Sequence, residues 1–180
     1  MPSPADFQLL AKYNQWMNNK VYDATATLTP DDFTEHRGAF FGSVSGTLNH
    51  ILVADIIWLK RYARHPMDFP ALAPVLALPD PASLNAVLHD EFDALWQARQ
   101  ALDKVILEFA DALSEEAIAT PLAYHNTKGE PYTKQLGHLL MHLFNHQTHH
   151  RGQVTTLLNQ YGADVGVTDL LALLPDTEEA

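Results

Sequence analysis

Hydrophobic positions recur every three or four residues over most of this chain, which is the spacing of amphipathic α-helices. The pattern predicts four long helices, at roughly residues 5–27, 43–64, 83–113 and 133–161. Ser43 and Ser83 are the predicted N-caps of the second and third helices, and Gly162 is a predicted stop for the fourth. The second helix is apolar on nearly every side, so we expect it to be buried at the centre of the molecule.

The segments between these helices carry signals of their own. Residues 65–81 hold five prolines, which predicts a long crossover loop rather than a regular helix. Residues 118–135 lack helical spacing, and a turn signal at residues 126–129 predicts two short extended stretches around it. Four long helices with one long crossover are typical of an all-α four-helix bundle. We therefore expect residues 1–180 to form one such domain, with the Pro-rich loop joining its second and third helices.

Composition narrows the classes of function. The 180 residues include 11 Lys+Arg and 22 Asp+Glu, and the formal net charge of −11 argues against a basic surface for nucleic acid. The absence of cysteine excludes a thiol nucleophile, a disulfide framework and thiolate metal sites. No segment resembles a targeting signal, and Asp55, Lys60 and Arg61 interrupt the longest apolar stretch. We expect a cytoplasmic protein that binds neither membranes nor nucleic acid.

Histidine is the residue type that does not fit an ordinary acidic domain. Half of the ten histidines lie in the last predicted helix: His138, His142, His146, His149 and His150. At about 100° per residue they fall within a sector of roughly 120°, so they share one face. A pair at i and i+4 is about 6 Å apart along the axis and can bind one ion, whereas a histidine at i+8 is about 12 Å away. This helix can therefore supply only two ligands to one metal ion.

The i, i+4 spacing alone does not decide which histidines bind the metal. Three pairs have this spacing: His138/His142, His142/His146 and His146/His150. We favour the last pair, because Arg151 and Gln153 beside it could orient the ligands. His50 is the best third ligand, since it is a polar residue in a helix that is otherwise apolar. The alternative is that these histidines line a polar, water-filled groove that holds no metal.

Several better-known sites do not match these residues. A zincin needs Glu directly after its first histidine, but Gln147 stands there and cannot act as a general base. Di-iron bundles use Glu-x-x-His pairs, and no Glu in the chain has His three residues later. A Gly-Ser-Val-Ser-Gly string looks like a nucleophile elbow, but its central residue is Val44.

An H-x-x-x-H-R-G-Q string at residues 146–153 follows an N-H at 49–50 and a D-x-x-W at 55–58, and the tail has Gly-Val-Thr-Asp at 166–169. With these strings the chain resembles the DinB/YfiT-like family over nearly its whole length. The first string is fairly specific when it follows the N-H, whereas H-x-x-x-H alone would be weak. The tail is similar to that of members of the damage-inducible-protein branch.

This resemblance implies a four-helix bundle with a divalent metal ion, often nickel or zinc, held by three histidines. The matching positions are His50, His146 and His150. Members of the wider superfamily include thiol-dependent S-transferases and isomerases that use bacillithiol, mycothiol or glutathione. The family is often dimeric, so we expect a homodimer with a small-molecule substrate and a role in a stress response. The family name refers to induction by DNA damage and implies no contact with DNA.

Three further residues are candidates for supporting roles. His142 lies one turn before His146 and is our candidate catalytic residue, as a proton carrier near neutral pH; a hydrogen-bonded structural role is the alternative. Asp55 lies in an apolar helix, so its carboxylate should be paired. Arg151 is a candidate partner for it, and we place both residues behind the metal ligands.

Three histidines leave an ion with at least one open position, which catalytic sites keep. One reading is a transferase in which a small external thiol, held as thiolate, attacks an electrophile. A second is a hydrolase of a small substrate that uses metal-activated water. A third is a metal-binding or ligand-binding stress protein without catalysis. The absence of cysteine is consistent with an external thiol, because the chain supplies none of its own.

Overall fold

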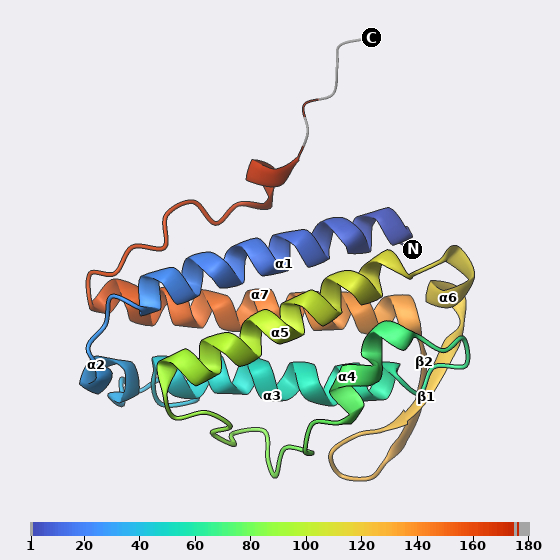
Figure 1. Cartoon of the computed structure of the whole chain (residues 1–180), viewed down its shortest axis with the longest axis horizontal. Helices are drawn as coiled ribbons and strands as arrows, with labels where there is room; N and C mark the ends of the chain where they lie inside the picture. The colour runs from blue at the N-terminus through green and yellow to red at the C-terminus, as the bar shows by residue number, and fades with distance from the viewer. Residues whose placement is uncertain (1, 175, 177–180) are drawn as a thin grey trace.

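In the computed structural model, which describes residues 2–174 and 176, four long helices lie side by side (Figure 1). They are α1 (Pro4–Thr25), α3 (Val44–Tyr62), α5 (Phe92–Asp111) and α7 (Leu136–Gln160). The shorter elements are α2 (Pro30–Thr34), η1 (Pro70–Leu72), α4 (Ala73–Leu76), α6 (Glu115–Ala119), β1 (Pro121–His125), β2 (Pro131–Gln135) and η2 (Leu170–Leu173). The prediction of a mostly helical chain is confirmed, with a small sheet in addition.

The long helices enclose one apolar core. α1 packs against α5 and α7, and α3 packs against α7 and α5, so each long helix contacts two others. Every one of them contributes fully buried side chains, such as Val21, Leu52, Ile106 and Leu158. Burying such side chains is the main source of the stability of a helical domain of this size. The expected burial of α3 is confirmed, since most of its residues are inaccessible to solvent.

Local capping fixes where the helices begin and end. Ser43 caps α3 by accepting a hydrogen bond from the Gly46 backbone N–H, as predicted. Ser3 and Asp6 form a capping box at the start of α1. The end of α7 is followed by Gly162, whose φ of +75° is a left-handed conformation that glycine adopts without strain.

The predicted beginning of the third long helix at Ser83 is wrong. α5 begins at Phe92, and residues 83–91 form an irregular segment instead. The Asn49 side chain on α3 accepts hydrogen bonds from the backbone N–H groups of Leu88 and His89, at 2.8 and 3.0 Å. These backbone N–H groups therefore bond to α3. In a helix that began at Ser83 they would have been needed for the helix's own hydrogen bonds.

The two extended stretches expected around the turn signal form a hairpin. β1 and β2 pair antiparallel with Ala123 opposite Thr133, and Gly129 in the connecting turn has a φ of +81°. Because residues 131–135 belong to this sheet, α7 begins at Leu136 rather than Thr133. The hairpin lies at the end of the molecule where α7 begins (Figure 1). None of the helices in the described residues is both long enough and apolar enough to cross a membrane.

Candidate metal site

α3 and α7 lie against each other, and this contact brings three histidines together. His50 comes from α3, and His146 and His150 come from successive turns of α7. One ring nitrogen from each lies within 4.8 Å of the others, close enough for all three to bind one metal ion. The grouping predicted from the sequence is therefore present in the structure.

The imidazole of His50 is fixed in one orientation. Its Nδ1 donates a hydrogen bond to the Leu84 carbonyl oxygen at 2.7 Å, so its Nε2 keeps the lone pair that a metal needs. This Nε2 lies 3.2 Å from the Nε2 of His146. Two nitrogens bound to one tetrahedral zinc ion at 2.0–2.1 Å are about 3.4 Å apart, so the observed spacing fits a shared ion.

The imidazole of His150 is oriented by its own helix. Its Nδ1 donates to Gln153 Oε1 at 2.9 Å, while the amide nitrogen of Gln153 lies 3.3 Å from His149 Nε2. With Nδ1 engaged, Nε2 of His150 is the nitrogen available for coordination. In the described residues the buried Nδ1 of His146 has no hydrogen-bond partner.

All three imidazoles are set up to be neutral, which is the form that binds metal. Burial lowers the pKa of His50, against the opposing effect of its bond to Leu84. Burial lowers the pKa of His146 to about 3, and repulsion from the neighbouring histidines adds to this. Burial also lowers the pKa of His150. Neutral imidazoles at the spacing of metal ligands fit a divalent ion.

An aromatic side chain covers one flank of the cluster. The ring of Phe41 stacks on His50, with 3.7 Å between ring centroids and 15° between planes, and approaches His150 at 5.5 Å. The loop that carries Phe41 comes very close to the first turn of α3. A Cβ on Gly46 would lie 2.0 Å from the Phe41 carbonyl oxygen, so only glycine permits this approach.

A cavity of about 210 Å³ adjoins the cluster, and His50 and His146 line it together with Trp58 and His142. His142 is exposed, and its ring lies 5.0 Å from Trp58 and 5.9 Å from His146. Partial burial lowers the pKa of His142, and the nearby Arg61 charge lowers it further. No Asp or Glu lines this cavity in the described part of the chain. His138, one turn earlier, is exposed and does not line it.

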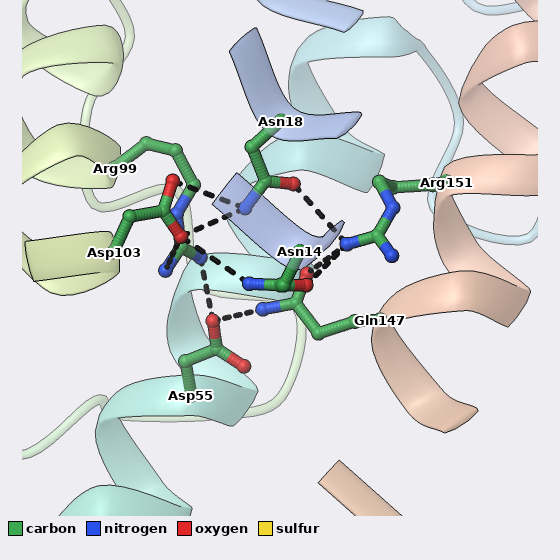
Figure 2. Close-up of polar contacts among 7 residues, drawn as sticks. All are labelled: Asn14, Asn18, Asp55, Arg99, Asp103, Gln147 and Arg151. Atoms are coloured by element: carbon green, nitrogen blue, oxygen red, sulfur yellow. Dashed lines mark hydrogen bonds and ion pairs between the residues drawn. The ribbon is translucent and has the colours of Figure 1, made fainter. Parts of the chain in front are cut away.

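The buried acid of α3 has a different partner from the one expected. Asp55 pairs with Arg99 of α5, with 2.5 Å between Oδ2 and Nη1, and also accepts a hydrogen bond from Gln147 (Figure 2). Arg99 in turn pairs with Asp103 at 3.0 Å. Arg99 and Asp103 were not predicted from the sequence, although both fall in the buried stripe of a helix whose neighbouring positions are apolar.

Arg151 is buried nearby but does not bond to Asp55. It donates to Asn14 and to Gln147, the latter at 3.1 Å. Figure 2 shows the resulting buried polar network, which draws on all four long helices: Asn14, Asn18, Asp55, Arg99, Asp103, Gln147 and Arg151. Asp55 and Arg151 make no hydrogen bond to His50, His146 or His150 in the described residues. That they support the metal ligands remains a prediction.

Comparisons with known proteins show the family and support the fold. Residues 1–179 match the DinB family. The chain is 27% identical over 174 residues to Protein DinB of Bacillus subtilis (strain 168), which covers 95% of this chain and 96% of that protein. A crystal structure of a DinB-like protein from Bacillus cereus ATCC 10987 matches with a TM-score of 0.59 over 85% of this chain and 91% of that one, at 18% identity, which supports the fold. The chain therefore belongs to the DinB family.

Proposed function

We propose that this protein is a metal-dependent S-transferase that joins a small external thiol to a small electrophile. His50, His146 and His150 would hold a divalent ion, zinc or nickel. The observation that carries the proposal is the 3.2 Å separation of the Nε2 atoms of His50 and His146, beside a cavity that can admit a small molecule. An ion in this position would act as a Lewis acid and lower the pKa of a thiol.

The residues around the cavity have definite tasks in this proposal. His142 would accept the proton of the thiol, because its lowered pKa keeps its imidazole neutral near pH 7. The sulfur forms its bond to the electrophilic carbon, and the leaving group departs with the electron pair of the bond that breaks. Trp58 and Phe41 would exclude water from the two flanks of the cluster.

The lining of the cavity favours thiol transfer over hydrolysis. Metal-dependent hydrolases of the zincin type position a Glu to activate water, and the described residues place no carboxylate in this cavity. The chain has no cysteine, so it supplies no competing thiol. The thiol that reacts at this site would therefore be a small molecule that binds from solution.

Metal content is the first test. Protein purified without an affinity tag should contain about one divalent ion per chain, measured by mass spectrometry of the metal. His50→Ala and His146→Ala should each lose it, whereas His138→Ala should keep it because His138 lies outside the cluster. Unchanged metal content in the first two variants would show that these histidines are not the ligands.

Turnover is the second test. The metal-loaded protein is assayed with model electrophiles and, in turn, glutathione, bacillithiol and mycothiol. Conjugation that depends on both thiol and metal supports the proposal. Metal-dependent turnover without any thiol would favour the hydrolase, and a metal-loaded protein inactive in every combination would favour the binding protein.

A further inference from the structure

One arginine lines the cavity beside the candidate metal site. Arg61 lies in the last turn of α3, and its guanidinium carbon is 4.6 Å from the ring centre of Trp58 and 5.2 Å from that of Tyr124. It lines the same cavity as His50 and His146. The two rings hold the guanidinium in one place, so it is a fixed positive charge beside the candidate metal ligands.

This charge has no acidic partner in the described part of the chain. The neighbouring Lys60, by contrast, pairs with Asp80 at 2.6 Å. Burial lowers the pKa of Arg61, since nearby groups compensate only partly for the water its guanidinium has lost. In a chain with 22 acidic residues against 11 basic ones, a half-buried arginine without an acid is unexpected on structural grounds alone.

The cavity also continues beyond the three histidines. A second cavity of about 490 Å³ shares five lining residues with the first, Arg61 among them. Arg64 and the ion pair of Lys60 with Asp80 also line this second cavity. Arg61 is therefore at the boundary between the two. Together they have room for a ligand that is longer than the metal cavity alone, within the range of small-molecule sites.

We propose that Arg61 binds an anionic oxygen group, of the carboxylate or phosphate type. This group belongs to the same molecule whose reacting atom reaches the three histidines. This inference rests on the proposed function and specifies its substrate class. The planar guanidinium offers two parallel N–H donors, which match both kinds of group. Arg61 would act as a positioning residue that sets the direction in which the ligand enters.

Three thiols of similar length provide the probe. 3-Mercaptopropionate and (2-mercaptoethyl)phosphonate carry an anion, and 3-mercapto-1-propanol is neutral. Their dissociation constants for the cobalt-loaded protein are measured from the sulfur-to-cobalt absorption. We expect at least one anionic thiol to bind about tenfold more tightly than the alcohol, as a charge-assisted hydrogen bond allows. The tighter of the two anions then identifies the natural group.

Variants assign the preference to Arg61. Arg61→Gln should abolish it and change the affinity for the alcohol far less than the affinity for the anions, and Arg61→Lys should keep part of the preference because the charge remains. Lys104→Gln removes one exposed positive charge on α5 and should have no effect. Equal affinities of the unmodified protein for all three thiols, or an Arg61→Gln variant that weakens all three alike, would overturn the inference.

A second readout does not need the metal. The indole N–H signal of Trp58 in the NMR spectrum, assigned with Trp58→Phe, is followed in metal-free protein during titration with the same probes. An anion bound to the guanidinium stacked on Trp58 should shift this signal more than the alcohol does. Failure to bind metal would thus count against the proposed function, whereas an equal response to all probes would count against the anion site.

Discussion

At the scale of single residues, two of the three candidate ligand imidazoles are held by what their second nitrogen contacts. For His50 the contact is the carbonyl oxygen of Leu84, and for His150 it is the side chain of Gln153. Such partners fix the tautomer and the ring orientation, and their loss typically weakens metal binding ten- to a hundredfold. Of the two, Gln153 is the one that a mutation can remove.

We therefore predict that Gln153→Ala binds metal about tenfold more weakly than the unmodified protein, because His150 loses the acceptor that holds its Nδ1. Gln153→Glu keeps an acceptor oxygen and should retain most of the affinity. The measurement is competition with a chelator of known affinity. Gln100→Ala, at an exposed position of α5, is the control. Full affinity in Gln153→Ala would show that His150 needs no such partner.

The raised pKa of Asp55 predicts how the stability of the protein depends on pH. Burial raises its pKa from the usual 3.8 to about 6, although Arg99 opposes this shift. The folded protein therefore binds this proton more tightly than the unfolded chain does. The stabilisation that the proton provides is fully present below about pH 4 and is lost as the pH rises through 6.

We expect the free energy of unfolding of the unmodified protein to exceed that of Asp55→Asn by about 1 kcal/mol more at pH 5 than at pH 7. Urea unfolding of both metal-free proteins at the two pH values measures this difference. The imidazoles of His50, His146 and His150 titrate in both proteins, so their contributions largely cancel in the comparison. A difference that is constant with pH would show that Asp55 does not titrate in this range.

The residues of the site differ in how far the sequence could predict them. Spacing placed the histidines of α7 on one face but left three pairs open, and the polar neighbours of His146 and His150 favoured that pair. His50 was a candidate because it interrupts an apolar helix. The role of Leu84 was not readable, because it acts through a backbone carbonyl that every residue possesses. Phe41 was also missed, since stacking on His50 depends on a loop conformation that hydrophobic spacing does not encode.

At the scale of elements, the segment at residues 83–91 shows where local signals fail. Ser83 is a good N-cap residue and apolar residues follow it at helical spacing, yet the segment is held irregular by α3. The segment carries the carbonyl of Leu84 to His50, so the missed irregular segment is also a missed part of the site. Contacts between residues some 40 positions apart overrode the local pattern.

Asn49→Ala should release this segment. The buried Asn49 side chain accepts from Leu88 and His89 and donates to the His89 carbonyl oxygen at 2.9 Å, and alanine can do none of this. We expect a loss of about 2 kcal/mol in the free energy of unfolding and faster hydrogen exchange at residues 84–89.

Metal affinity should fall as well, because the Leu84 carbonyl oxygen no longer holds His50 in place. The control is Asn85→Ala, since Asn85 is exposed in the same segment and bonds only to Ser83 in the described residues. If exchange at residues 84–89 stayed unchanged in Asn49→Ala, the segment would be held by other contacts.

At the scale of the whole molecule, the centre of the helical core contains charges. Arg99 and Arg151 face Asp55 and Asp103, so the four formal charges sum to zero, and amides from α1 and α7 fill the remaining positions (Figure 2). Replacing such a network by apolar residues of equal volume often costs nothing, so it is weak evidence for stability as such. It does join all four long helices, and a polar cluster of this kind can select one helix register over another.

Arg99 is the residue on which this network most depends, because it contacts both acids. Arg99→Met should lower the free energy of unfolding by about 3 kcal/mol or more, since it leaves buried carboxylates without their cation. Lys104→Met breaks only an exposed pair with Glu108 and should cost less than about 0.5 kcal/mol. If the damage in Arg99→Met comes from uncompensated charge, adding Asp55→Asn should cost less in that background than it does alone. If the damage comes from lost packing, the two losses should simply add. Urea unfolding of the single and double variants separates these two causes.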